Sequence, residues 1–343
     1  MTRVLVVLPN WFGETLFATP FLRALRHGLP EAWISTLGWP QCREILQHNP
    51  DLNAHIDLDE RHAHRGWLGK LDLSRQLRGE RFDAAAILRK SLSRTLLTSM
   101  AGVPQRIGFD EPKAGWLLTH RVARPAVAIH KAASYLPLLA PLGIEPPRQP
   151  GTCTYVVSEA ERRAAHERFG AASHDRRPLV ILHPGANWPH KRWAPARFAA
   201  LGDELVERQG ARIAVTGAPE DAATALAIAG AMRGPCTVLA GTTTVRELAA
   251  CLEEAALVVA NDTGVLHLAA ALGRPVVALY GPTSPAITGP LGGPRGTIVL
   301  HHGDSCPQIP CYRPDDPPHP GMDRITVEEA YRAAISLLEM PNG

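Results

Sequence analysis

Four polar or small residues, Asn261-Asp262-Thr263-Gly264, interrupt two apolar stretches, the second of which contains His267. A carboxylate, a hydroxyl and a glycine at such a break are typical of the point where a buried strand turns into a helix. The unpaired N–H groups at a helix N-terminus bind anions, phosphate above all. These residues therefore predict half of a phosphate site. The alternative is that Asp262 or Thr263 only caps the helix.

A second polar cluster, NWFGET (residues 10–15), follows the first apolar run of the chain. Gly13 permits a tight turn there, and Glu14 stands at the expected start of a helix. A carboxylate in such a position can act as a general base. The alternative is that Glu14 only complements the helix dipole.

A third cluster is the loop HPGANWPHKRW (183–193), in which Gly185 precedes the cations Lys191 and Arg192. Lysine and arginine are the side chains that bind phosphate groups. The loop therefore predicts a contact with an anionic ligand, and a solvated lysine is the alternative.

One more carboxylate, Glu220, follows the strand-like segment that ends in VTGAP. Its carboxylate could bind both hydroxyls of a ribose. The alternative is that it only stands at the start of a helix, where the helix dipole favours a negative charge. No G-x-G-x-x-G follows the first strand, and no P-loop motif occurs in the chain. These absences disfavour a dinucleotide dehydrogenase and a P-loop enzyme.

The elements that must position these clusters alternate between strand-like and helix-like segments. A Pro- and Gly-rich loop, 144–152, divides the chain, after which the alternation begins again. Such alternation predicts parallel sheets wrapped by helices. We therefore expect an α/β protein with two doubly wound domains that face each other across a cleft. The expected strands are 3–9, 33–39, 55–59 and 82–88 in the first half, and 177–185, 211–217, 236–241, 256–261 and 275–282 in the second.

Charge is distributed unevenly along the 343 residues, whose formal net charge is +3. Residues 1–150 contain 19 Lys and Arg against 13 Asp and Glu, so the basic excess lies in the first half. That excess suits an anionic partner, although a solvated face is the ordinary explanation and nucleic-acid binders show a sharper cluster. The candidate contacts in its densest patches are Arg61, Arg65, Lys90 and Arg94.

The six cysteines are scattered, and their spacing resembles neither a zinc knuckle nor a disulfide framework. Most are expected to be small core residues. Cys306 and Cys311 lie in a Pro-rich stretch with His319, so a metal cluster is conceivable there, but we expect no metal. No apolar run approaches the length of a membrane span, and the N-terminus does not resemble a signal peptide, so a cytoplasmic protein is expected.

Together, the Trp11-Phe12-Gly13-Glu14 turn, the PGA…KRW loop at 184–193 and the stretch NDTGVLHLAAALGRPVVALYGPTSP resemble the family 9 glycosyltransferases, the ADP-heptose:lipopolysaccharide heptosyltransferases. The heptosyltransferase II branch is the most similar. The resemblance runs through nearly the whole chain in order. Two features depart from the family: it usually has Asp at the position of Glu14, and it often has more cysteines in the tail than Cys306 and Cys311.

The resemblance implies a GT-B fold of two Rossmann-like domains. An acceptor-binding domain would span residues 1–155 and a nucleotide-sugar domain residues 156–325, and a helix at 326–343 would pack back on the first domain. The implied reaction is an inverting transfer of heptose from ADP-heptose to an anionic lipopolysaccharide-core acceptor, without an essential metal or cofactor. The implied partners include no nucleic acid, and the protein is expected to be a monomer, peripheral at the inner membrane face.

The resemblance also assigns roles to residues. Glu14 would be the general base, and Lys191 would offset the charge of the leaving ADP. Asp262 would contact the donor sugar. The remaining expected donor contacts are Gly13, Gly185, Arg192, Glu220, Thr243, Thr263, Gly264 and His267. Two other functions stay open: the same fold acting on another nucleotide sugar or a soluble acceptor, and a non-catalytic nucleotide-sugar-binding protein.

Overall fold

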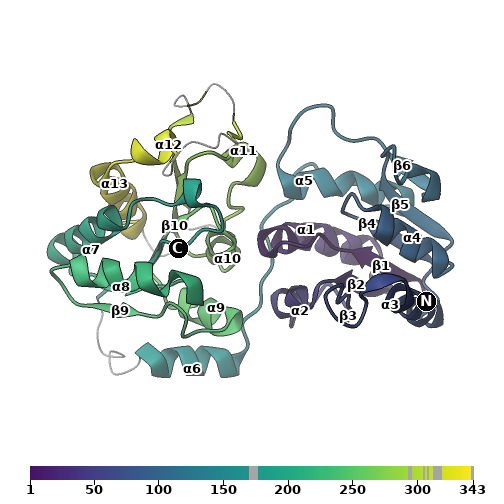
Figure 1. Cartoon of the computed structure of the whole chain (residues 1–343), viewed down its shortest axis with the longest axis horizontal. Helices are drawn as coiled ribbons and strands as arrows, with labels where there is room; N and C mark the ends of the chain where they lie inside the picture. The colour runs from purple at the N-terminus through teal and green to yellow at the C-terminus, as the bar shows by residue number, and fades with distance from the viewer. Residues whose placement is uncertain (170–176, 293–295, 304–305, 307–308, 312–318, 341–343) are drawn as a thin grey trace. The chain divides into compact units, whose positions relative to one another are not determined.

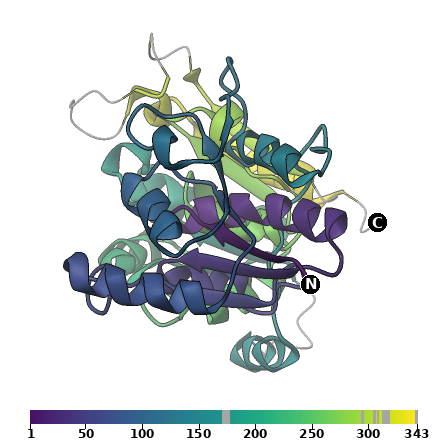
Figure 2. The ribbon, with the colours of Figure 1, turned by 90° about the vertical axis from the view of Figure 1, so that its right-hand side faces the viewer.

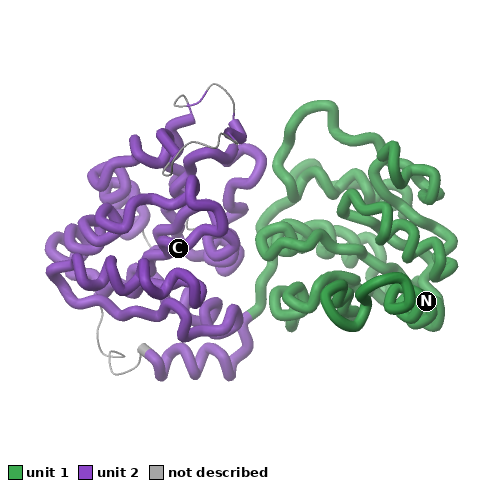
Figure 3. The backbone as a smooth tube through the Cα atoms, viewed as in Figure 1, with its two compact units in different colours: residues 1–156 green, residues 157–343 purple. Residues whose placement is uncertain are grey.

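The computed structural model describes residues 1–169, 177–292, 296–303, 306, 309–311 and 319–340. The chain divides into two compact units, residues 1–156 and 157–343, which Figure 3 draws in green and purple. Each unit is described separately below. Among the described residues, no helix has both the length and the apolar character needed to cross a membrane.

Unit 1 is built on a six-stranded parallel sheet in the order β3-β2-β1-β4-β5-β6. Its central strand is an apolar run, of which Val4 to Val7 are buried, as is usual for a parallel strand covered on both faces. Helices lie on either side of the sheet (Figures 1 and 2), with α1 against α2 and α5, and α3 against α4. The elements are β1 (Arg3–Val7), α1 (Phe12–Gly28), β2 (Trp33–Gly38), α2 (Pro40–Leu46), β3 (Ala54–Asp57), α3 (Gly66–Gly79), β4 (Ala84–Ile87), α4 (Leu92–Met100), β5 (Gln105–Phe109), η1 (Gly115–Leu117), β6 (His120–Val122), α5 (Lys131–Tyr135) and η2 (Leu136–Leu142).

Unit 2 repeats this design in the order β12-β11-β10-β7-β8-β9, with every recorded pairing parallel. The elements are α6 (Glu159–Phe169), β7 (Leu179–His183), η4 (Pro189–Lys191), α7 (Pro195–Gln209), β8 (Arg212–Val215), η5 (Pro219–Asp221), α8 (Ala222–Ala231), β9 (Cys236–Val238), α9 (Val245–Glu253), β10 (Leu257–Asn261), α10 (Gly264–Ala271), β11 (Val276–Tyr280), α11 (Pro285–Thr288), β12 (Thr297–His301), α12 (Pro320–Asp323) and α13 (Val327–Leu338).

The expected strands are all present, and the prediction of two doubly wound α/β domains is confirmed. Three strands, β5, β6 and β12, were not among those expected. β5 and β6 carry polar residues, as in Gln105–Phe109 and His120–Val122, so their apolar signal is weak, whereas β12 has an apolar centre but is only partly buried. Both sheets have the strand order of a Rossmann fold, in which the order reverses between β1 and β4 and between β7 and β10.

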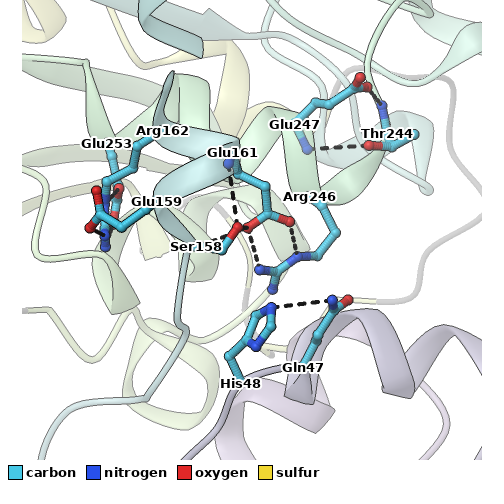
Figure 4. Close-up of polar contacts among 10 residues, drawn as sticks. All are labelled: Gln47, His48, Ser158, Glu159, Glu161, Arg162, Thr244, Arg246, Glu247 and Glu253. Carbon is cyan, nitrogen blue, oxygen red and sulfur yellow. Dashed lines mark hydrogen bonds and ion pairs between the residues drawn. The ribbon is translucent and has the colours of Figure 1, made fainter. Parts of the chain in front are cut away.

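Helix α6 is fixed to α9 within unit 2 by ion pairs (Figure 4). Arg246 donates to both carboxylate oxygens of Glu161, at 2.7 and 2.6 Å, and Ser158 donates to the same carboxylate. The bond to Arg246, the largest influence, helps lower the pKa of Glu161 to about 2. A second pair joins Arg162 to Glu253 at 2.7 Å. These contacts anchor the start of unit 2 to its sheet.

The final helix, α13, begins at a capping box formed by Thr326 and Glu329. Its buried face, which includes Tyr331 and Leu337, belongs to the apolar core of unit 2 and lies against α7 and the strands β10 to β12. This is the helix that the resemblance implies packs back on the first domain. Its buried apolar residues complete the core of unit 2.

Candidate functional site

The order of the second sheet reverses between β7 and β10, and the polar clusters at 183–193 and 261–264 follow these two strands. Ala260 pairs with His183 in register, so both loops leave the same edge of the sheet side by side. Fully buried Asn261 joins them: its Nδ2 donates to the Pro184 carbonyl at 2.8 Å, and its Oδ1 accepts from the Trp193 N–H at 3.2 Å. The edge thus has the geometry of a ligand site at a topological switch point.

Lys191 and Asp262 meet across this switch point. Lys191 Nζ donates to Asp262 Oδ2 at 2.6 Å, and Thr283 Oγ1 donates to the same oxygen at 2.6 Å. His267 Nε2 lies 3.7 Å from the other carboxylate oxygen. The Asp262 side chain is 4% exposed, whereas that of Lys191 is 17% exposed, so the cation keeps access to solvent and to a ligand.

Helix α10 starts directly behind Asp262, with Thr263 as its N-cap residue. The Thr263 side chain makes no capping hydrogen bond, so the alternative in which Thr263 serves only as a cap does not hold. Its Oγ1 is buried, and no described residue provides a hydrogen-bond partner. A buried hydroxyl without a partner costs free energy unless a ligand pairs with it. Together with the first N–H groups of α10, it forms a site suited to an anion.

Asp221 lies beside the loop that follows β7. Arg192 pairs with Asp221 at 3.2 Å and donates to the Ala186 carbonyl, so this arginine holds the loop. Gly185 has to be glycine, because a Cβ atom there would overlap the Asp221 carboxylate. His183 bonds to Thr216 at 3.0 Å, and burial lowers the pKa of His183 to about 4, against the opposing charge of Asp221. His183 is therefore neutral near pH 7.

Two expected donor contacts lie further out on the same unit. Glu220 is exposed in η5, next to the end of β8, and Thr243 is half-buried in the turn between β9 and α9. Glu220 follows β8 and Thr243 follows β9. These are the next two strands after β7 on the side of the sheet away from β10. Among the described residues, neither has a partner that fixes its role.

In unit 1, Gly13 and Glu14 lie in the first turn of α1, just after the end of β1. Glu14 forms a close ion pair with Lys131, the first residue of α5. The pair forms because α5 packs against α1. Its two side chains remain 21% and 39% exposed, so a ligand can reach the carboxylate. Burial, followed by the charge of Glu14, raises the pKa of the neighbouring Tyr135, which is therefore a neutral phenol.

Arg94, which we expected to bind the acceptor, is only 2% exposed. It donates to the Leu8 carbonyl at 2.5 Å and to the Asn10 side chain, and it lies 3.6 Å from Glu60. That expectation is corrected: Arg94 supports the chain just after β1, because its position on α4 directs it into the unit and not to the surface.

The other three basic candidates are exposed. Lys90 lines a cavity of about 310 Å³ behind β4 and β5, together with Arg89, Lys113 and Arg124, and it pairs with Glu111 at 3.1 Å. Arg61 stacks over Trp39 beside a second cavity, of about 230 Å³, behind β2 and β3. Arg65 is exposed at the start of α3.

Sequence reasoning missed Thr283, Asp221 and Lys131 as members of these sites, and it gave Asn261 no role of its own. Asn261 and Asp221 each stand beside a residue that was singled out, so the motif itself held the signal. Thr283 follows Gly281-Pro282 at the end of β11 and belongs to the quoted motif. Lys131 had no local signal, because it is 117 residues from Glu14 in the chain.

Two Rossmann-like units, with polar clusters gathered at the switch point of the second, have the architecture of the GT-B class of glycosyltransferases. The model of glycosyltransferase family 9 (heptosyltransferase) matches residues 70–312. The chain belongs to this family and is a glycosyltransferase.

Named relatives agree with this assignment. Lipopolysaccharide heptosyltransferase 2 of Escherichia coli K12 is 31% identical over 312 residues, which cover 88% of this chain and 89% of the relative. The protein of the same name from Salmonella typhimurium LT2 is 30% identical with the same coverage. The structure of E. coli ADP-heptose lps heptosyltransferase II has a TM-score of 0.81 at 26% identity, covering 98% of both chains. The family 9 glycosyltransferase of Veillonella parvula DSM 2008 has the same fold, with a TM-score of 0.86 at 24% identity over 98% of this chain and 97% of that one.

Proposed function

We propose that this enzyme transfers heptose from ADP-heptose to a phosphorylated sugar of the lipopolysaccharide inner core, with inversion at the anomeric carbon. The observation that carries the proposal is the set of groups at the switch point of unit 2: Lys191 paired with Asp262, and the N-terminus of α10 beside the buried Thr263 hydroxyl. Relatives at 30 and 31% identity are named lipopolysaccharide heptosyltransferases, which supports the choice of sugar and acceptor.

Donor binding falls to unit 2. The N–H groups of Thr263 and Gly264, with the Thr263 hydroxyl, bind the diphosphate, and Lys191 neutralises part of its charge. Asp262 and His267 lie next to Lys191, where they reach the sugar. Glu220 binds the ribose hydroxyls, and Thr243 lines the adenine. Gly185 and Arg192 shape the loop after β7. Because protein groups offset the charge, the diphosphate needs no metal ion.

Acceptor binding and activation fall to unit 1. Glu14 accepts the proton of the acceptor hydroxyl as that oxygen bonds to the anomeric carbon and the bond to the ADP oxygen breaks. ADP leaves with the bonding electron pair, and Lys191 offsets its charge. A single displacement of this kind inverts the anomeric centre. Lys131 orients the Glu14 carboxylate through their ion pair. Lys90, Arg61 and Arg65 attract the acceptor's phosphates.

The acceptor's lipid anchor places the reaction at the cytoplasmic face of the inner membrane, where the enzyme acts as a peripheral monomer. One screen tests the donor: hydrolysis or transfer is measured with ADP-heptose and with UDP- and GDP-sugars under the same conditions. We expect activity with ADP-heptose alone. Preference for another nucleotide sugar would contradict the proposed donor, and binding without turnover for any sugar would indicate a binding protein.

Calorimetry tests whether the diphosphate site works without a metal. We expect ADP to bind with nearly the same affinity with and without added Mg²⁺. Binding that requires Mg²⁺ would contradict the proposed role of Lys191 and α10.

A further inference from the structure

Three potential metal ligands meet in unit 2 outside the site described above. The ligand atoms of Cys306, Cys311 and His319 all lie within 4.8 Å of one another. The three residues are 8%, 4% and 5% exposed, and both cysteines are thiols. They belong to the part of the chain between β12 and α12, and the sequence spacing matches no common zinc motif. The fold, not the spacing, brings them together.

The chemistry of this donor set is specific. Two thiolates and an imidazole are ligands that zinc prefers, at about 2.3 Å for sulfur and about 2.0 Å for nitrogen. Ligands at those distances around a tetrahedral ion are roughly 3.5–4 Å apart. The three ligand atoms lie within 4.8 Å of one another, so small adjustments of the side chains bring them to these distances. We propose that Cys306, Cys311 and His319 bind one Zn²⁺ ion, whose fourth ligand comes from solvent.

The role of the ion follows from what the ligands contact. The Cys311 N–H donates to the Pro282 carbonyl at 2.8 Å, in the turn after β11. His319 is the N-cap of α12, and Met322 of that helix is fully buried in the core of unit 2. Zinc at this point ties the chain before α12 to the Gly281–Thr283 turn. The ion would hold this segment in place, and the proposal does not depend on the proposed reaction.

Proton balance gives the site a pH dependence. Each cysteine loses its thiol proton on binding, so two protons are released per ion, and the imidazole binds in its neutral form. His319 Nδ1 accepts a hydrogen bond from the Gly321 N–H at 3.0 Å, so the neutral ring carries its proton on Nε2. Zinc either replaces that hydrogen bond at Nδ1 or binds Nε2 after the ring proton moves. In both cases zinc affinity rises with pH.

The test uses the full chain, purified without a histidine tag. We expect elemental analysis to find about one zinc per chain, retained through gel filtration. Replacement by Co²⁺ should give the near-ultraviolet charge-transfer band of thiolate ligation. Cys306→Ser, Cys311→Ser and His319→Gln should each lose most of the zinc. The matched control is Cys236→Ser, at a half-buried cysteine in β9, which should keep its metal content.

Three results would overturn the proposal. The first is a reduced wild-type chain that neither carries zinc nor develops the cobalt band when titrated with Co²⁺, a measurement that requires no variant to fold. The second is equal loss of zinc in the Cys236→Ser control. The third is a Cys306–Cys311 disulfide in the protein as isolated, detected as a mass lower by two hydrogens. None of these readouts involves turnover, so the proposed function stands or falls separately.

Discussion

Lys191 Nζ and Asp262 Oδ2 lie 2.6 Å apart and connect the loop after β7 to the end of β10. The pair spans the switch point of the second sheet, where a Rossmann-like unit binds its ligand. Asp262 is almost completely buried, and Lys191 is its partner on the solvent side. Asp262 therefore holds the Lys191 ammonium group at the ligand site.

Replacing this cation should weaken donor binding. For Lys191→Met we expect the Kd for ADP to rise about 10- to 100-fold, because a hydrogen bond to a charged group contributes about 1.5–3 kcal/mol. Isothermal titration calorimetry measures the change. Arg163→Met, at an exposed cation in α6, is the control and should bind ADP like the wild type. An unchanged Kd in the Lys191 variant would remove this residue from the phosphate site.

The Thr263 hydroxyl should matter for binding and not for folding. Thr263→Val removes a buried hydroxyl that has no described partner, so the free energy of unfolding should stay the same or rise. The Kd for ADP should rise about 10- to 100-fold, the effect of one hydrogen bond to a charged phosphate group. Denaturant unfolding and calorimetry measure the two quantities. Thr263→Ser keeps the hydroxyl and should bind normally; a loss of stability without a loss of binding would indicate a structural hydroxyl.

Glu14 is expected to limit turnover. Glu14→Gln removes the proposed base, and the rate of transfer should fall about 10²- to 10⁴-fold while ADP binding is unchanged. Glu31→Gln, at an exposed position after α1, is the matched control. Transfer by Glu14→Gln at a near wild-type rate would refute the assignment. Glu14→Asp should also be impaired, because a carboxylate displaced by about 1 Å can lose about 10²-fold in rate.

Buried Arg94 and exposed Lys90 should have different effects when they are replaced, the first on stability and the second on acceptor binding. Arg94→Met leaves the Leu8 carbonyl and the Asn10 side chain without their donor, so we expect a loss of about 2–4 kcal/mol in the free energy of unfolding. Lys90→Ala, at an exposed position, should unfold normally but bind the acceptor more weakly. Raising salt should weaken acceptor binding more than ADP binding, since exposed charges are screened. Equal salt sensitivity of the two ligands would contradict a role for Lys90, Arg61 and Arg65.

His183 should make the protein sensitive to acid. Its pKa is about 4 in the folded chain, against an ordinary value of 6.5, because burial disfavours the charged ring. Between these two pKa values only the unfolded chain takes up the proton. The contribution of neutral His183 to the free energy of unfolding is therefore fully present above pH 6.5, and it is lost as the pH falls from there through 4. The loss amounts to about 3 kcal/mol.

His183→Asn can still bond to Thr216 and should remove this part of the pH dependence, measured by denaturant unfolding at pH 7 and pH 5. His48→Asn, at an exposed histidine, is the control and should leave it unchanged. His55, whose pKa burial also lowers to about 4, keeps a similar dependence in unit 1. A His183→Asn protein with the full wild-type pH dependence would rule out this origin.

The sequence by itself determined the two doubly wound domains and the strand ends that carry polar clusters. Both follow from local patterns: a buried parallel strand such as Leu257–Asn261 is a continuous apolar run, and the residues after it must leave the sheet at its ligand-binding edge. A ligand contact could therefore be expected at Asp262 and Lys191 from the sequence, whereas the strand order that puts both at the switch point came from the fold.

Only the tertiary structure decided which distant side chains meet. Lys131 reaches Glu14 because α5 packs on α1, Arg94 turns inward to Leu8, and Cys306, Cys311 and His319 converge although their spacing fits no motif. The contacts of Lys131 and Arg94 depend on the packing of elements that are far apart in the chain. Local periodicity holds no information on that packing, because the apolar face of a helix shows that it is buried but not which side chains will lie beside it.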